Sequence, residues 1–377
     1  MGDMNKTNLN WAEINMSALH HNLEMVRSQL TAGTRIMAVV KANAYGHGAV
    51  EVSRALIDYG VDAIAVATLG EAVELRVNQI NIPILVLGTV AGQDIEELFE
   101  QGLLPSLNNL EMALCLNECG RKRGQKIKAH LRIDTGMGSY GLLPDECMQI
   151  IDKLVKMEYL ELDGIYTHIN TIYGGRREDA IKQVSSFEHL MTQLRQRGIH
   201  IPMVHASSSP AVLKLPEAEY DMVRLGIVLY GLPCGNQFLD DRVRAVMQIK
   251  TRVVTIKEVG SDFGVGYGCT FTTMSPTRIA TLAIGYADAG FLHFLKDGEV
   301  LICKQRAPII GKSCMDHLIV DVTHIKEAAV GDEAVVMGEQ GDERISAEEI
   351  AMRSGICMDN CDLVCLLSSR VQRVYIK

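Results

Sequence analysis

The sequence lacks the long apolar runs and the clustered positive charge that two large classes of protein require. No run approaches the roughly 20 apolar residues that a helix needs to cross a bilayer, so we expect no membrane span within these 377 residues. Acidic side chains number 46 against 37 basic ones, and the net charge is −9. No basic stripe with interleaved aromatic residues occurs, so nucleic acid is not an expected partner.

Paired metal-binding cysteines are also lacking. The ten cysteines are scattered, with no C-x2-C pair and no secretory leader before them, so reduced thiols are expected rather than disulfides. The densest group has the i, i+4 spacing of a helix, which favours packing over metal binding; it comprises Cys357, Cys361 and Cys365. No metal site is therefore expected.

Short apolar runs recur through the first two thirds of the chain, each followed by an amphipathic segment. Eight such repeats predict a closed parallel (β/α)8 TIM-like barrel. Two helices have clear limits, 17–31 with Ser17 as N-cap and 178–197. The strands are expected within 35–41, 62–68, 82–88, 103–108, 127–134, 162–168, 202–208 and 221–226.

After about residue 243 the pattern changes to apolar stretches separated by Gly, Asp and Pro, which predicts a mainly antiparallel β domain. We therefore expect a barrel over 1–243, whose first residues could pair with the second domain, and a β domain over 244–377. The β strands are expected within 246–260, 277–287, 298–311, 317–322 and 332–338.

The ends of the barrel strands carry the residues of chemical interest, because active sites of this fold lie at that face. Lys41 ends the first strand, where its amine would face the barrel mouth and could form a Schiff base, although a lysine there could also merely extend to solvent. His205 to Ser209 and Arg224 to Ile227 end the last two strands and offer hydroxyl and N–H groups for a phosphate, although serines there also cap helices. A lysine beside a phosphate site indicates pyridoxal 5'-phosphate.

Seven segments resemble the alanine racemase family in order and across nearly the whole chain. The resemblance implies a pyridoxal-phosphate barrel with a C-terminal β domain, working as a head-to-tail homodimer whose partner completes each active site. The segments are VVKANAYGHG, RIDTGMGSYG, YTHINT, MVRLGIVLYG, VGYGCTF, IGYADAG and GKSCMDH.

The resemblance also implies roles for individual residues. Lys41 would hold the cofactor and exchange a proton on one face of the substrate Cα, and Tyr267 of the partner would do so on the other, because inversion needs two opposed groups. His168 and Arg224 would assist Tyr267, and Arg224 would also donate to the pyridine nitrogen. Further cofactor contacts would be Tyr45, Ser208, Ser209, Gly226, Ile227 and Tyr286. The substrate contacts would be Ser139, Met315 and either Asn360 or Cys361. The alternatives are a core role for His168 and a packing role for Tyr45.

Two positions depart from the family pattern K-x-D-T-G-M-G-R, in which the lysine is carbamylated and the arginine orients the substrate carboxylate. Arg132 stands at the lysine position and Ser139 at the arginine position. Arginine cannot form that carbamate and serine carries no charge. Carboxylate binding must therefore be rebuilt in this chain.

A pocket tyrosine of the family would fall within residues 359–365, where Cys361 or, with a one-residue shift, Asn360 stands instead. The larger, more polar pocket resembles the racemase domain of the VanT-type serine racemases of vancomycin resistance, in which a membrane domain precedes. This implies a serine and alanine racemase that supplies D-serine for modified peptidoglycan precursors, either cytoplasmic or the cytoplasmic domain of a membrane-anchored protein. The alternatives are a housekeeping alanine racemase, a non-catalytic cofactor carrier and, with poorer motif order, a decarboxylase.

Overall fold

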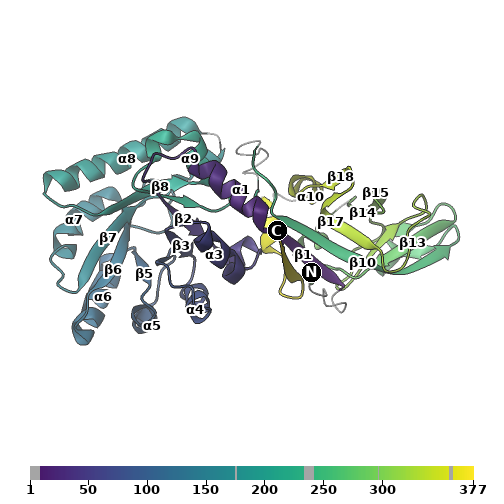
Figure 1. The fold of residues 1–377 in the computed structure, drawn as a ribbon, viewed down its shortest axis with the longest axis horizontal. Helices are drawn as coiled ribbons and strands as arrows, with labels where there is room; N and C mark the ends of the chain where they lie inside the picture. The colour runs from purple at the N-terminus through teal and green to yellow at the C-terminus, as the bar shows by residue number, and fades with distance from the viewer. Residues whose placement is uncertain (1–8, 175, 233–241, 296, 356–359) are drawn as a thin grey trace.

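The computed structural model describes residues 9–174, 176–232, 242–295, 297–355 and 360–377. These residues form a barrel with surrounding helices and a β domain beside it, joined by β1 and the long strand β10 (Figure 1). No helix among them is long and apolar enough to cross a membrane. The two predicted architectures are both present.

Eight parallel strands of the described chain close into the barrel, as predicted. They are rich in Val, Ile, Leu and Ala and almost wholly buried, as expected of strands covered on both faces. The strands are β2 (Arg35–Val39), β3 (Ala63–Val66), β4 (Ile84–Val86), β5 (Leu104–Leu107), β6 (Ile127–Arg132), β7 (Leu160–Tyr166), β8 (Met203–Ser208) and β9 (Met222–Leu225).

Helices follow the strands and cover the outside of the barrel (Figure 1). The predicted helix 17–31 is α1, which begins at Met16 and ends at Arg27; its N-cap is Asn15, whose side chain accepts from the N–H of Ala18, and the prediction of Ser17 as cap was wrong. The others are α2 (Lys41–Tyr45), α3 (Ala49–Asp58), α4 (Leu69–Val77), α5 (Ile95–Glu100), α6 (Leu110–Arg123), α7 (Pro144–Leu154), α8 (Arg177–Gln196) and α9 (Ser209–Lys214).

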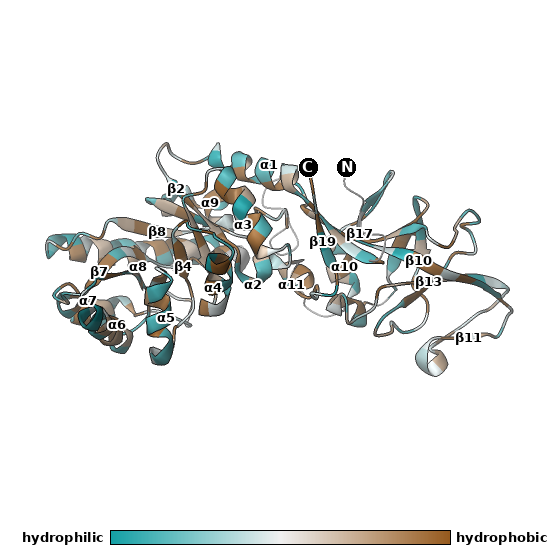
Figure 2. Cartoon of the chain, turned by 60° about the horizontal axis from the view of Figure 1, so that its bottom comes forward, coloured by the Kyte–Doolittle hydropathy of each residue, from teal (hydrophilic) through white to brown (hydrophobic). Residues whose placement is uncertain are grey.

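The β domain is built on a nine-stranded, mainly antiparallel sheet of the described residues. Its central strand β10 pairs with β1 and β17 and then, beyond an irregularity, with β13. A separate two-stranded hairpin, β11 with β12, lies at the end of this domain farthest from the barrel (Figure 2). The elements are β1 (Asn10–Asn15), β10 (Met247–Val259), β11 (Gly264–Val265), β12 (Phe271–Thr272), β13 (Thr277–Leu282), β14 (Glu299–Ile302), β15 (Gln305–Pro308), β16 (Leu318–Asp321), β17 (Glu333–Gln340), β18 (Glu343–Ile345), α10 (Ala347–Arg353), α11 (Asn360–Cys365) and β19 (Gln372–Ile376).

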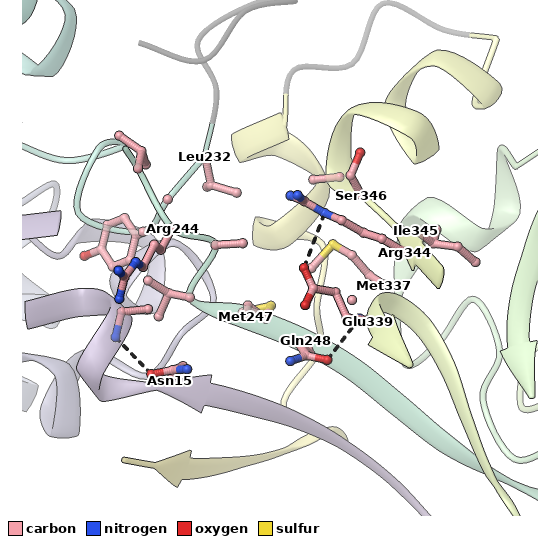
Figure 3. Close-up of a pocket in the computed structure, with 18 of the residues that line it drawn as sticks. Asn15, Leu232, Arg244, Met247, Gln248, Met337, Glu339, Arg344, Ile345 and Ser346 are labelled. Carbon is pink, nitrogen blue, oxygen red and sulfur yellow. Dashed lines mark hydrogen bonds and ion pairs between the residues drawn. The ribbon is translucent and has the colours of Figure 1, made fainter. Parts of the chain in front are cut away.

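A pocket of about 450 Å³ lies where the barrel meets the β domain (Figure 3). Some of its polar groups are engaged with one another: the N–H of Glu339 donates to Gln248 at 3.1 Å, and the Glu339 carboxylate lies 3.9 Å from Arg344. One buried carboxylate oxygen of Glu348 has no hydrogen-bond partner among the described residues. No residue from the carboxyl ends of the barrel strands lines it. None of the predicted site residues therefore lies in the wall of this pocket.

Candidate active site

A second pocket, of about 470 Å³, lies at the carboxyl ends of the barrel strands. The residues of its wall lie at the end of a barrel strand or in the loop that follows one. Barrels of this kind carry their active sites at this face. The pocket brings together nine of the predicted residues: Lys41, Tyr45, Ser139, His168, Ser208, Ser209, Arg224, Gly226 and Ile227.

Lys41 follows strand β2 and starts a turn of unusual backbone conformation. Residues 42–45 all have φ between 51° and 54°, in the left-handed region, where each non-glycine residue costs roughly 1–2 kcal/mol. The turn is held by His47, whose Nδ1 lies 3.1 Å from the Ala44 carbonyl oxygen and 2.8 Å from that of Tyr45. Burial lowers the pKa of His47 to about 4, so its ring is neutral at pH 7. Such strain is typical of functional sites.

The ends of β8 and β9, for which the sequence predicts a phosphate site, meet in this pocket. Ser209 Oγ accepts from the N–H of Gly226 at 2.9 Å, which ties the two strand ends together. Ser208 Oγ is buried and has no hydrogen-bond partner among the described residues. A Cβ at Gly226 would lie 2.8 Å from the Tyr45 hydroxyl, so glycine keeps this space open. A buried hydroxyl without a partner and a lysine, both on residues that line one pocket, fit pyridoxal 5'-phosphate.

Arg224 is anchored at the base of the pocket by a chain of buried groups. Its Nη1 lies 2.8 Å from His205 Nδ1, and its Nη2 donates to the carbonyl oxygens of Thr167 and Ala206. Since a guanidinium can only donate, His205 Nδ1 accepts and its Nε2 carries the proton, which it donates to His130 Nδ1 at 2.9 Å. Burial, aided by the charge of Arg224, lowers the pKa of both histidines, that of His130 to about 4.

His168 lines the same pocket just beyond the end of β7. Burial, and then the positive charges of three neighbours, lowers its pKa to about 3. The ring is therefore neutral at pH 7 and can accept or donate a hydrogen bond without changing charge. The three cations that converge on it are Arg224, Arg132 and Lys41.

Several pocket residues were not among the predicted site residues. Arg132 ends β6 and reaches the pocket, and Tyr166 ends β7, stacks on His205 at 4.7 Å between ring centroids and bonds to Ser106 through its hydroxyl. Tyr140 lies over the Arg132 guanidinium at 5.1 Å. Position at a strand end was the signal for Arg132 and Tyr166, but an aromatic residue there is equally typical of packing.

Other predicted residues lie away from this pocket. Tyr267 is 73% exposed in a short helical turn beside β11, and Met315 is 52% exposed. Tyr286 adjoins the Met315 segment, since its N–H donates to the Cys314 carbonyl oxygen and that of Ala287 donates to Met315. All of these belong to the β domain.

The two candidates for the pocket tyrosine position fall in α11, which packs against α2. Cys361 is half-buried there and does not line the pocket, and the side chain of Asn360 lies outside the described residues, as does Cys357. Cys365 is exposed at the residue level, so the expectation that this group is buried was wrong for it. No cluster of metal-binding side chains occurs in the described part of the chain.

Comparison with known proteins accounts for both domains. The family model described as "Alanine racemase, N-terminal domain" matches residues 14–233, and that described as "Alanine racemase, C-terminal domain" matches residues 246–375. The chain belongs to the alanine racemase family. Alanine racemases depend on pyridoxal 5'-phosphate, which confirms the predicted cofactor and agrees with the cradle described above.

Individual alanine racemases are similar over almost their full length. That of Methanococcus maripaludis is 40% identical over 97% of this chain and 98% of its own, and that of Halothermothrix orenii 39% identical over 99% and 98%. The solved structure of alanine racemase from Clostridium difficile 630 superposes with a TM-score of 0.93 at 36% identity, covering 98% of this chain and 96% of that one. These relatives are named alanine racemase, and nothing in them supports the predicted closeness to the VanT-type serine racemases.

Proposed function

We propose that this protein is a pyridoxal-phosphate-dependent racemase that interconverts L- and D-alanine. The observation that carries the proposal is Lys41 facing the same pocket as the cradle of Ser208, Ser209 and Gly226, so that one cavity offers both a covalent and a phosphate attachment. The similarity to proteins named alanine racemase supports alanine, the substrate of a housekeeping enzyme, over serine as the main substrate. A non-catalytic carrier would have no use for the β-domain residues that match the family motifs.

The residues of the pocket have separate roles in the proposed racemisation. When bound, pyridoxal 5'-phosphate supplies an electron sink for the negative charge that forms at the substrate Cα. Tyr45, Ser208, Ser209, Gly226 and Ile227 would hold its phosphate, and Lys41 would exchange the Cα proton on one face. We assign Tyr286 to the cofactor surroundings on its family motif.

Arg224 and His168 set the electrostatics at the base of this pocket. Arg224 would hold the pyridine nitrogen of the cofactor as a donor only, so that nitrogen would carry no proton and the group would supply a weaker electron sink, which would favour return of the proton to Cα. His168 is neutral at pH 7 and sits among the three cations, so it adds no positive charge to the site. Both groups therefore limit how long charge remains on Cα.

The second proton-exchanging group comes from another copy of the chain. Tyr267 belongs to the turn that packs on β11, at the end of the β domain farthest from the barrel (Figure 2). One chain therefore does not bring Tyr267 to its own Lys41. We propose a homodimer in which the β domain over 244–377 presents Tyr267 and Met315 to the barrel over 1–243 of the partner.

Serine is the second candidate substrate, as the main substrate or beside alanine. Ser139 replaces the family arginine in the wall of the pocket, and α11 contains no tyrosine at either candidate position. Both changes leave room and polar groups for a hydroxyl. A hydrophobic pocket rejects an added hydroxyl by only about a hundredfold, so one enzyme can use both amino acids. D-serine for peptidoglycan precursors and vancomycin resistance would follow only from a serine preference.

The deciding experiment is racemisation of L-alanine and L-serine by the purified protein loaded with pyridoxal 5'-phosphate, with kcat/KM measured for each. We expect alanine to have the higher value. A serine value equal to or above that of alanine would replace the main proposal with the second candidate. Turnover of neither, with cofactor bound, would contradict both and favour a carrier.

A further inference from the structure

Arg132 is a buried cation without a counter-ion in the described part of the chain. It is 9% exposed at the end of β6 and lines the pocket together with Lys41 and His168. Within the described residues, its guanidinium makes one hydrogen bond, from Nη1 to the Leu87 carbonyl oxygen at 3.1 Å, and no ion pair. A guanidinium has five N–H donors, so most of its capacity remains available to an anion.

The carboxylate closest in sequence, Asp134, is committed to another task. Its two oxygens accept from the N–H groups of residues 136–139 at 2.8 to 3.2 Å, which folds the loop after β6 into a tight turn. The loop then returns against Arg132, where a Cβ at Gly141 would lie 2.9 Å from the Arg132 carbonyl oxygen. Backbone donors thus occupy both oxygens of the Asp134 carboxylate, which makes no ion pair with Arg132 in the described part of the chain.

Two aromatic rings hold the Arg132 guanidinium in place. Its central carbon lies 5.1 Å from the ring centroid of Tyr140 and 5.7 Å from that of Tyr166. Cation–π contacts of this kind stabilise the charge and orient the planar group without using its N–H donors. The Asp134 turn carries Tyr140, so the same loop that removes the nearby carboxylate also positions the guanidinium.

Arg224, the other buried guanidinium of the pocket, is less available to an anion. Its Nη1 and Nη2 are engaged with His205 and the two carbonyl oxygens of Thr167 and Ala206. Lys41 is assigned to the cofactor. Of the three cations around His168, Arg132 is therefore the one with donors to spare.

We propose that Arg132 binds the α-carboxylate of the amino-acid substrate. The family's carboxylate-orienting arginine is replaced by Ser139, and the guanidinium at position 132 supplies the missing charge from the neighbouring strand end. A bidentate contact would fix the carboxylate and so the plane in which the Cα proton leaves, while Ser139 adds a hydroxyl at the loop. The inference rests on the proposed racemase function and names its carboxylate-positioning residue.

The test separates recognition of the carboxylate from recognition of the amine. The probes are propionate, which is alanine without its amine, as a competitive inhibitor, and ethylamine, which has the amine and no carboxylate, followed by the change in cofactor absorbance. In the loaded enzyme, Arg132→Met should raise the inhibition constant of propionate about ten- to hundredfold and leave the ethylamine response within about twofold. Arg54→Met, on the surface of α3, should change neither.

Two further variants complete the test. Arg132→Gln keeps N–H donors without the charge and should show a smaller loss for propionate, and it replaces the Met variant if that protein does not retain cofactor. Arg132→Met with Ser139→Arg should regain part of the propionate binding, because the guanidinium returns to the loop. An unchanged propionate constant in Arg132→Met, or equal weakening of both probes, would overturn the inference. If the unaltered protein racemises neither amino acid, the proposed function fails; propionate binding is then followed by the change in cofactor absorbance, and its ratio between the proteins still tests Arg132.

Discussion

The two groups assigned to proton exchange, Lys41 and Tyr267, lie in opposite kinds of environment. Lys41 starts a strained left-handed turn at the end of a buried strand, with cations and a neutral histidine around it. Tyr267 is 73% exposed beside a two-stranded hairpin that touches no part of the barrel. The first environment is complete within one chain, whereas the second needs a surface that a single chain does not offer. Damage to the Lys41 side should therefore affect the stability and the activity of the chain, and damage to the Tyr267 side should affect only the activity of the assembled dimer.

The largest effect is expected from separating the two groups onto different chains. Lys41→Ala and Tyr267→Phe should each lower kcat for alanine by about a thousandfold or more, because each removes a proton-exchanging group. Mixed after unfolding and refolding together, the two inactive proteins should recover about a quarter of normal activity, since half the dimers are mixed and each mixed dimer has one intact site. The activity of the equimolar mixture is compared with that of the unaltered protein at the same total concentration.

The control is the same mixture made without unfolding, in which existing dimers exchange slowly or not at all. Lys41→Ala mixed with a protein that carries both changes should stay inactive, because no pairing then joins an intact lysine to an intact tyrosine. Recovery in that second mixture, or no recovery in the first, would rule out a site shared between chains.

The next largest effect concerns acid stability on the Lys41 side. His47 has a pKa of about 4 when folded and about 6.5 when unfolded, so the unfolded state binds the extra proton between these values. Stability is therefore full above pH 6.5 and is lost as the pH falls toward 4, by about 3 kcal/mol for this residue. Urea unfolding at several pH values measures the loss.

His47→Asn supplies the matched comparison for that measurement. The asparagine amide can donate to the carbonyl groups of the left-handed turn as Nδ1 does, but it does not titrate. The pH slope of the unfolding free energy should fall by one proton between pH 6.5 and 4.5. Tyr267→Phe should leave the slope unchanged, and a slope equal in all three proteins would show that His47 is not the group responsible.

A smaller effect is expected from Ser209→Ala. The change removes the acceptor of the Gly226 N–H, which then lies buried without a partner, at a cost of about 1–3 kcal/mol in unfolding free energy. Cofactor affinity should fall together with stability, because the same hydroxyl ties the phosphate cradle. Thermal unfolding measures the stability, and cofactor titration measures the affinity. Tyr267→Phe serves as a control and should change neither quantity. Loss of cofactor affinity without loss of stability would contradict the link.

The smallest effect should be a gain. Ala42 is exposed with φ of 52°, a conformation that glycine adopts without strain, so Ala42→Gly should stabilise the protein by about 0.5–1 kcal/mol. The exposed alanine Ala329, whose φ is not positive, serves as the control and should lose stability on replacement by glycine. Chemical denaturation measures the change in unfolding free energy, which should be a gain at Ala42 and a loss at Ala329. A loss at Ala42 would mean that the turn is not strained in solution.

The barrel and the β domain could be predicted from the sequence because local patterns specify them. Each barrel strand is a short run of apolar residues buried on both faces, and the change of pattern after residue 243 marks the loss of the intervening helices. Lys41, Ser209 and Arg224 could be placed at one rim because carboxyl ends of parallel strands meet there. The helix cap at Asn15 was missed because Asn15 and Ser17 are both good caps and only the backbone decides between them.

Two aspects of the site were beyond such patterns. The role of Arg132 depends on the Asp134 carboxylate being occupied by four backbone N–H groups and on Tyr140 returning over the guanidinium, and neither contact has a local sequence signal. The place of Tyr267 depends on a second chain, about which periodicity says nothing. Resemblance to a family supplied Tyr267, whereas for Arg132 the sequence showed only a departure from the family pattern, shared with Ser139.

The pairing of β1 with both β10 and β19 has a consequence for synthesis on the ribosome. β1 ends at Asn15, but its first partner begins at Met247, and its parallel partner β19 begins only at Gln372. At about 5–20 residues per second, β1 emerges roughly ten to fifty seconds before any strand that it pairs with. The barrel can close during that interval, whereas β1 must wait as an unpaired edge. Nascent chains halted before β10 should therefore hold a formed barrel and a free first strand, which is where a chaperone would bind.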